Sequence, residues 1–463
     1  STFLFQGRHT KTYTLQDNAD YLWGDHALRF GVQSNAYRAL RLNDGGVLPT
    51  YVIGVGTNTP QITAAMFTNA ALFPGGINTT DRTTANQLYA FLGGIVSQQS
   101  QTFNVLSADE GLVPLAGFRQ DYAYENYNIY FSDQWRVRPN LVVNLGLRCE
   151  LWPAVRERNG VLAEVIVPEG KTVAEALLDP NGGLQTAGTN VGGGKLFNTD
   201  KNNFAPSFSV AWSPTFKNNF MNSLFPGEGR TVIRGGYRLS YFNDEFLKGS
   251  SGQGDQNSGK RENASRNNLN ERLGSLGTIA TPTVLIPRTF AQNNARNGGA
   301  IQSVAVTDPN IKLPINHEYT IGIQRELGFK TAFEIRYVGA FSNNVTRYTD
   351  VNPPELLTNG FLEDFFRARS NQALTGQLNC TTAQNPGCQP LQVFINLGTL
   401  SGTPGGIGNA TTAANATVAN LVSTGLPGQL AATYVGNGLS GTVPLVANPN
   451  IALGLLLSNS ARY

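Results

Sequence analysis

The chain has 463 residues, of which only 14% are charged, whereas soluble globular proteins usually have roughly 25%. Its 51 Gly, 16 Tyr and 25 Phe, set against 2 Met, favour strands and long polar loops over a helical bundle. The net charge of +3 gives no support to nucleic acid as a partner, and no run of about 18 apolar residues offers a transmembrane helix.

The first predicted element is a long β-hairpin, whose strands alternate strictly between apolar and polar residues. The turn is Gly24-Asp25, and the returning strand places Arg29 on its polar face. The apolar positions of the returning strand are Leu28, Phe30 and Val32. We assign residues 1–42 to this first barrel hairpin. Residues 43–117 are predicted to form an extracellular excursion, because the long connections of a barrel all lie on one side.

A second hairpin has the clearest alternation in the chain. The segment LVVNLGLRCEL begins at Leu141 and places Arg148 and Glu150 on its polar face. The preceding segment YENYNIYFSDQW alternates in the same way, and the turn between the two strands contains Pro139. Cys149 lies on the apolar face, where we expect a buried or lipid-facing thiol.

Two further hairpins complete the stretch 118–341. The third hairpin pairs residues near 204–212 with residues near 233–241, and the fourth turns at residues 328–330. The charged residues on their polar faces include Arg234, Arg238, Glu334 and Arg336.

The length of these strands separates two interpretations. A soluble β-sandwich would show the same alternation, but soluble strands usually run about five or six residues. The predicted strands run roughly ten to fifteen residues, which matches a tilted strand that crosses a membrane. The four tryptophans fall at or near strand ends, where an interfacial aromatic girdle would lie. These residues are Trp23, Trp135, Trp152 and Trp212.

The connections also follow the pattern of bacterial outer-membrane barrels, with short turns on one side and long loops on the other. The long outer loops are residues 153–202 and 246–316, and residues 342–463 form a long extracellular loop region. Within 246–316, the segment SSGQGDQNSGKRENASRNN has the composition of a disordered segment.

The long C-terminal region is predicted to carry short helices. Residues 359–376 favour an amphipathic helix with Asn359 as its N-cap, and a second helix is predicted around residues 413–423. The inward positions of the first helix are Phe361, Leu362, Phe365 and Leu374. Cys380 and Cys388 lie in the short polar loop NCTTAQNPGC, where a disulfide would form in an oxidising compartment.

Five segments in order resemble one known family. They are NYNIYFSDQWRVRPNLVVNLGLRCEL, DKNNFAPSFSVAWSP, GEGRTVIRGGYRLSYF, INHEYTIGIQRELGFKTAFEIRYVGAFSNN and VNPPELLTNGFLEDFFRARSNQAL. Together they are similar to the Oar-like TonB-dependent outer-membrane receptors, especially those common in Acidobacteria. The resemblance extends from about residue 10 to the end of the chain.

The resemblance implies a 22-stranded barrel, an N-terminal plug that contacts TonB, and energised uptake or a surface role such as adhesion. The chain departs from this pattern, because we recognise neither a plug domain nor a TonB box and count eight membrane strands. We therefore expect the plug domain to be absent and the chain to form only a portion of the barrel, as a fragment or a processed product.

The candidate site residues are charged positions that we expect to face the barrel lumen. They are Arg29, Arg148, Glu150, Arg234, Arg238, Glu334 and Arg336. These side chains would line a passage or contact a plug, although any polar lumen also needs charges for solvation. No catalytic role is expected for the three histidines, because no known catalytic motif is present. These histidines are His9, His26 and His317.

No cofactor is expected, and no metal is assigned. Two surface turns, Asp179-Pro180-Asn181-Gly182 and Asn243-Asp244-Glu245, offer oxygen ligands for calcium, but neither has the spacing of a defined site. We favour ordinary turn chemistry as the explanation of both segments.

The sequence thus predicts an all-β, transmembrane antiparallel barrel in the bacterial outer membrane, with its long loops outside the cell. The expected function is that of a TonB-dependent receptor that captures a saccharide, a peptide or a metal chelate. The expected partners are outer-membrane lipid, the TonB system if the full chain carries a plug, and neighbouring surface proteins. The alternative is a structural or adhesive surface protein anchored by the barrel, and an enzyme is not expected.

Overall fold

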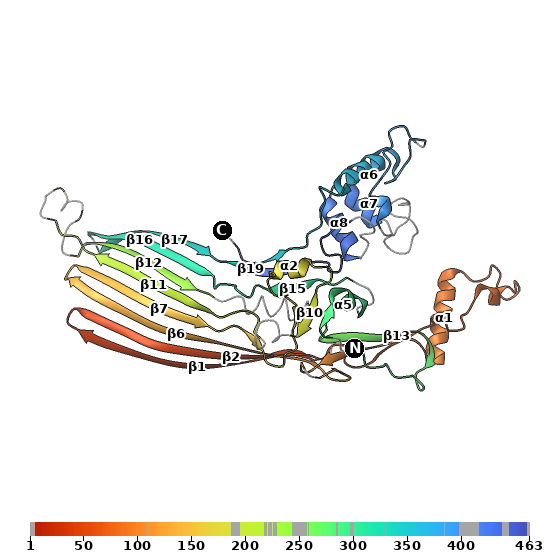
Figure 1. Ribbon diagram of the computed structural model, residues 1–463, viewed down its shortest axis with the longest axis horizontal. Coiled ribbons are helices and arrows are strands. Elements are labelled where there is room, and N and C mark those ends of the chain that lie inside the picture. The colour runs from red at the N-terminus through yellow and green to blue at the C-terminus, as the bar shows by residue number, and fades with distance from the viewer. Residues whose placement is uncertain are drawn as a thin grey trace.

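The computed structural model describes residues 5–460, apart from several gaps. The gaps are residues 109, 187–194, 217–219, 221–224, 226–228, 243–256, 258, 284–285, 297–300, 329, 384, 398–415 and 438–443. Within the described part, long strands form one large antiparallel sheet, and smaller sheets and helices gather at one end of it (Figure 1).

The principal sheet contains nine strands within the described residues. Its strand order is β1-β2-β6-β7-β11-β12-β16-β17, and the short β8 pairs with β6. The bounds are β1 Gln6–Trp23, β2 His26–Asn43, β6 Phe118–Arg138, β7 Leu141–Trp152, β8 Arg156–Glu157, β11 Asp200–Trp212, β12 Thr231–Tyr241, β16 Ile315–Gly328 and β17 Thr331–Asn343. All four predicted hairpins are present, and the two strands of the first pair along their whole length, from Gln6 to Asn43.

Three smaller sheets lie where the long connections leave the principal sheet (Figure 1). One contains β3 Thr50–Ile53, β4 Ile95–Val105, β5 Leu112–Val113 and β13 Arg261–Arg272. The second contains β9 Ala163–Val165, β10 Gly183–Thr186 and β14 Arg288–Thr289, and the third contains β15 Val304–Thr307, β18 Thr346–Asp350 and β19 Gly454–Asn459. The prediction of disorder was wrong for residues from Arg261 onward, because they form β13 along β4.

The helices also belong to the long connections. They are η1 Ala64–Phe67, α1 Thr79–Gly93, α2 Val173–Leu178, α5 Phe290–Arg296, α6 Phe361–Thr375, η3 Phe394–Asn396, α7 Ala416–Ser423 and α8 Pro427–Gly436. In the described ranges, no helix is long and apolar enough to span a bilayer.

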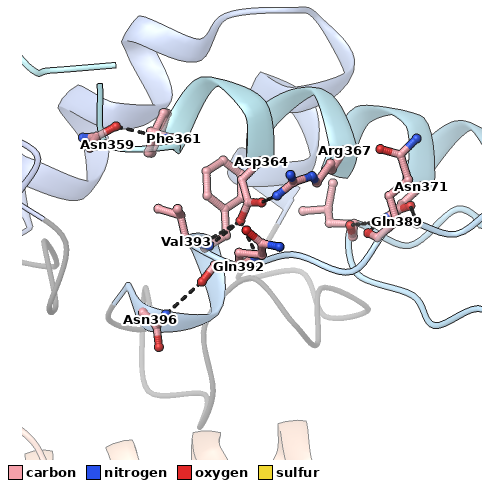
Figure 2. A network of polar contacts seen from close by, with 11 residues as sticks. Asn359, Phe361, Asp364, Arg367, Asn371, Gln389, Gln392, Val393 and Asn396 are labelled. Carbon is pink, nitrogen blue, oxygen red and sulfur yellow. Dashed lines mark hydrogen bonds and ion pairs between the residues drawn. The ribbon is translucent and has the colours of Figure 1, made fainter. Parts of the chain in front are cut away.

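The helices α6, α7 and α8 enclose a separate hydrophobic core, which includes the fully buried Phe361, Phe365 and Phe394. At the edge of this core, the buried Asp364 carboxylate accepts hydrogen bonds from the backbone N–H groups of residues 392, 393 and 394 at 2.8, 2.6 and 3.0 Å (Figure 2). The Asp364 carboxylate also accepts a hydrogen bond from Arg367 at 2.8 Å. A single side chain therefore joins α6 to the first turn of η3.

Two details of the predicted helix α6 were wrong. The residue at the N-cap is Gly360, while Asn359 accepts a hydrogen bond from the backbone of Phe361 at 3.0 Å and donates to the Glu355 carbonyl at 2.8 Å. Leu374 is half exposed, and the inward face instead carries Asp364, Ala368 and Asn371. For the second predicted helix, α7 covers the part from residue 416 onward, and residues 413–415 lie outside the described residues.

Buried asparagine side chains hold the long connections together. Asn352 donates to the carbonyls of Asn448 and Ile451 at 3.0 and 3.1 Å, and its own carbonyl accepts from the Asn448 N–H at 2.8 Å. Asn448 in turn donates to the carbonyl of Leu177 at 2.7 Å. Because an amide side chain both donates and accepts, it satisfies backbone groups that lie outside regular strands.

Candidate functional site: the polar face of the principal sheet

Strand pairing divides the principal sheet into an apolar face and a polar face. One row across four strands of the apolar face is Val32, Ile129, Cys149 and Phe204. One row across six strands of the polar face is Arg29, Ser132, Gly146, Ser207, Arg238 and Glu318. Because side chains alternate along a strand, these rows fix the face of the other residues in the regular part of the sheet.

The pairing places all seven predicted charged candidates on this polar face. Arg148 and Glu150 follow Gly146 at even spacing on β7. Arg234 lies four residues before Arg238 on β12, which is two full alternations. Arg234 pairs across the sheet with Gly322, and Gly322 pairs with Arg336 on the next strand. Glu334 lies two residues from Arg336 on β17.

Three ion pairs involve these candidates. Arg29 contacts Asp20 at 2.7 Å, Arg148 contacts Glu150 at 2.9 Å, and Arg238 contacts Glu318 at 2.6 Å. The first pair is well exposed on both sides and so contributes little to stability. Among the described residues, no ion pair is found for the exposed Arg234, Glu334 and Arg336.

Neutral side chains connect neighbouring strands on the same face, and the sequence analysis did not single them out. Thr14 donates to Asn35 at 2.8 Å, and Asn35 donates to Asn126 at 2.7 Å, which links three strands. The Tyr130 hydroxyl donates to Asn18 at 2.7 Å. The signal in the sequence is the recurrence of amide and hydroxyl residues at every second position.

Two hollows lie on the polar face and share Asn144 in their lining. The first has a volume of about 450 Å³ and is lined by Ser207, Ser209, Arg238 and Glu318 among others. The second has a volume of about 560 Å³ and includes Asp20, Arg29, Ser132 and Gln134. Hydroxyls, amides and charges of both signs line them, which suits a polar solute bound by hydrogen bonds.

The apolar face ends in stacked rings near the short turns. His26 stacks on Trp23 and on Trp135, with ring centroids 5.9 and 5.2 Å apart. The Nδ1 atom of His26 lies 2.7 Å from the carboxylate of Asp133, which also lies on the apolar face. Tryptophan at this height is typical of the interfacial girdle of a membrane barrel.

The other end of the apolar face carries a similar group. His317 stacks on Phe341 with centroids 4.4 Å apart and hydrogen-bonds the Tyr237 hydroxyl at 2.7 Å. In contrast, the prediction that Trp152 belongs to this girdle was wrong. Its indole N–H donates to Glu150 at 3.0 Å, because Trp152 follows Leu151 and therefore lies on the polar face.

The remaining predicted sites lie outside the principal sheet. The structure places a disulfide between Cys380 and Cys388, with Cα atoms 5.6 Å apart, whereas Cys149 is a free thiol. Asp179 accepts a hydrogen bond from the Asn181 N–H at 2.9 Å, as in an ordinary Asx turn. Residues 243–245 lie outside the described residues. No group of three or more His, Cys, Asp and Glu side chains in the described part is arranged to hold a metal ion.

One buried acid escaped the sequence analysis. Glu164 on β9 is fully buried, and neither of its carboxylate oxygens has a hydrogen-bond partner among the described residues. Burial raises the pKa of Glu164 to about 8. No local signal marks this residue, because its burial results from contacts between distant segments.

Comparison with known proteins shows the family to which this large sheet belongs. The sequence of residues 1–435 matches the family described as outer membrane beta barrel domain. The outer membrane transporter YddB from Escherichia coli is similar in structure, with 12% sequence identity and a TM-score of 0.35. The match covers 75% of this chain but only 27% of YddB, so the chain spans about a quarter of that transporter's length.

A second solved structure is the CymD monoaromatic hydrocarbon channel, with 9% sequence identity, a TM-score of 0.15 and coverage of 72% of each chain. No curated protein matches the chain.

Proposed function

Because the chain belongs to the outer membrane beta barrel domain family, we propose that it forms part of the wall of a receptor that captures a ligand with its long loops and passes it through a polar lumen. The protein is an outer-membrane protein with a transmembrane antiparallel β fold. The finer assignment that we propose is an Oar-like, TonB-dependent receptor of the kind common in Acidobacteria. No covalent chemistry is part of this proposal.

The observation that carries the proposal is the opposite character of the two faces of one sheet. Stacked aromatic rings lie at both ends of the apolar face, as they do on a surface that contacts lipid. The polar face combines paired arginines and carboxylates with the two hollows that meet at Asn144. A water-filled passage needs such a lining, and its mixed charge favours polar solutes of low net charge.

The orientation follows from the connections. Short turns join the hairpins at the end that carries Trp23 and Trp135, and the smaller sheets and helices lie at the other end (Figure 1). In outer-membrane barrels the short turns face the periplasm and the longer loops face outward. We therefore place α1, α6, α7 and α8 outside the cell, where they meet a saccharide, a peptide or a metal chelate. Energy would come from the TonB system acting on a plug.

The test is uptake by the source bacterium. A deletion strain, its parent and the complemented deletion strain are each supplied with one limiting nutrient. This nutrient is a maltooligosaccharide, a tripeptide or a ferric siderophore. We expect the deletion to reduce uptake of at least one of them several-fold, and a protonophore to reduce uptake by the parent to the same level. Equal uptake of all three nutrients by the deletion strain and its parent would contradict the proposal.

A structural or adhesive role is the second candidate, and α1 favours it. This helix lies far from the principal sheet (Figure 1), and its residues Leu88, Phe91 and Leu92 are more than half exposed. Apolar side chains at such a place are typical of a surface that contacts another macromolecule. If adhesion is the role, the variant L88S/F91S/L92S loses cell attachment while uptake by its host strain is unchanged.

A further inference from the structure

A charged cluster begins where the apolar face of the principal sheet ends. On β6 the apolar face carries Trp135, Asp133, Phe131, Ile129 and Tyr127. The next two-residue step along this strand, about 7 Å further, brings Glu125 onto the same face. The register between β2 and β6 has no shift over their whole length, so the face of each residue is well defined.

Four arginines and three carboxylates form this cluster. Glu125 contacts Arg38 at 3.0 Å and Arg156 at 3.5 Å. Asp121, which lies four residues before Glu125 on the same face, contacts Arg158 at 2.8 Å. Arg119 contacts Asp44 at 2.7 Å. The exposed Lys11 on β1 pairs with Arg38 across the strands and adds a fifth base.

The bases lie outermost and the acids lie beneath them. The side chains of Glu125 and Asp121 are 12% and 24% exposed, whereas those of Arg156 and Arg158 are 45% and 55% exposed. The carboxylates thus hold the guanidinium groups in place, while about half of each of these two arginine side chains stays exposed. The five bases exceed the three acids, so a positive charge remains on this surface.

Its height in the membrane indicates what this surface meets. Tyr127 lies at the edge of the apolar band, where aromatic residues mark the level of the headgroups. Side chains one to three steps beyond Tyr127 on the same face point toward lipid headgroups, and not into the lumen. Arginine presents a planar fork that matches the oxygens of a phosphate group, and basic residues at this level bind anionic headgroups.

We propose that Lys11, Arg38, Arg156 and Arg158, held by Glu125 and Asp121, form a binding site for the phosphate group of a lipid in the outer leaflet of the outer membrane. This site depends on the placement of the sheet in the membrane and is independent of ligand uptake. Ion pairs on a surface that faces only water contribute little to stability.

The experiment uses the full chain in nanodiscs of phosphatidylcholine doped with lipid A, in its diphosphorylated form or after enzymatic dephosphorylation. Native mass spectrometry counts the doped lipid retained by each protein. We expect the parent to retain diphosphorylated lipid A about tenfold better than the dephosphorylated form, and added NaCl to reduce this preference. Equal retention of the two forms would overturn the proposal, and this comparison requires no variant.

The variant R156Q/R158Q tests the assignment of the residues. We expect it to lose most of the preference for diphosphorylated lipid A. R29Q is the matched control, because Arg29 is also exposed and ion-paired but lies on the opposite face, and it should keep the parental preference. If R156Q/R158Q fails to fold, as judged by heat-dependent gel mobility, K11Q on the exposed strand β1 replaces it.

Inorganic phosphate at millimolar concentration separates the two sources of a phosphate group. Retention of diphosphorylated lipid A in its presence supports a lipid site, whereas complete displacement would indicate a site for soluble phosphate and overturn the assignment to lipid. The proposal would also be contradicted if R156Q/R158Q or K11Q preferred diphosphorylated lipid A as strongly as the parent does.

Discussion

At the scale of single residues, Gly31 shows how the polar face depends on close packing. The ring of Tyr130 crosses over Gly31 to reach Asn18. A Cβ atom at position 31 would lie 2.8 Å from this ring and 2.6 Å from the backbone oxygen of Asp17. Only a residue without a side chain fits there, so the glycine is required by the contact between β1, β2 and β6.

We therefore expect G31A to lower the free energy of unfolding by about 1–3 kcal/mol, because the backbone or the tyrosine must move. G235A is a suitable control, since the nearest atoms to its added Cβ would be 3.8 Å away. Urea unfolding of both variants in the same detergent micelles measures the difference. Equal midpoints for G31A and G235A would show that Tyr130 does not occupy this place.

Glu164 gives a prediction about pH. Its carboxyl keeps its proton up to a pKa of about 8 in the folded protein, whereas the ordinary value is 4.5. The folded state therefore binds more protons than the unfolded state between these values, and stability decreases as pH rises through that range. The expected slope is about 1.4 kcal/mol per pH unit.

The change E164Q removes this ionisation, so the region around β9 should become insensitive to pH between about 5 and 8. Hydrogen exchange of residues 161–186, corrected for intrinsic rates, measures the local stability. The exposed Glu169 lies in the same segment, and E169Q should retain the parental pH dependence. A parent protein with constant protection over this range would contradict the prediction.

At this scale the sequence predicted the faces of the strand residues and missed the buried acid. Arg148 and Glu150 belong to an alternating strand, where the positions of neighbours decide the face. Glu164 lies on a strand of three residues, which is too short for a period, and its burial depends on segments far away in the chain.

At the scale of elements, the helical unit depends on one carboxylate. Asp364 accepts three backbone N–H groups at the start of η3 and one guanidinium N–H (Figure 2). In D364N an amide NH₂ group replaces one of these accepting oxygens, and buried donors lose their partner. We expect a local destabilisation of about 3 kcal/mol.

Hydrogen exchange of residues 389–397 measures this loss, and the strands of the principal sheet should remain protected as in the parent. E363Q changes the neighbouring acid in the first turn of α6, which is exposed, and should leave the exchange of residues 389–397 unchanged. Equal exchange in D364N and E363Q would show that Asp364 does not hold η3.

The helix α6 was predictable because its apolar spacing and its two flanking glycines are local signals. The residues on its inward face could not be predicted in full, since Asn371 is buried and Leu374 is half exposed. That side chain donates to the carbonyls of Leu378 and Gln389 at 3.1 and 2.7 Å. Hydrophobicity cannot identify a position that is buried for its hydrogen bonds.

At the scale of the whole molecule, the central prediction is that one face of the sheet contacts lipid. Ile321 and Thr320 are neighbours on β16, both exposed, and they lie on opposite faces. I321K would place a charge in the apolar band and should cost about 2–4 kcal/mol, whereas T320K would add a charge to the polar face at little cost.

Membrane fractionation and heat-dependent gel mobility of the two variants provide the readout. I321K should show reduced insertion, and T320K should behave as the parent does. If the two variants insert equally, then the apolar face does not contact the hydrocarbon.

The large sheet was predictable from its hairpins, because each pairs strands that are close in sequence. The small sheets were not, since β13 pairs with β4, and β15 pairs in parallel with the distant β19. Long-range pairs leave no local signal here, because β15 and β19 have only 4 and 6 residues and the 12 residues of β13 are almost all polar. The rows of polar residues across the principal sheet depend on the register in which neighbouring strands pair. The short turns at Gly24 and Pro139 restrict this register for β1 with β2 and for β6 with β7.

The distance between the rings at the two ends of the apolar face also determines which bilayers suit this protein. From Trp135 to Tyr127 the apolar face of β6 spans about nine residues, which at a tilt of about 40° corresponds to a height of roughly 21 Å. This is less than the roughly 30 Å hydrocarbon core of an average bilayer. Short-chain lipids should therefore match the protein best, and in a thicker bilayer the surrounding lipid must become thinner to meet it.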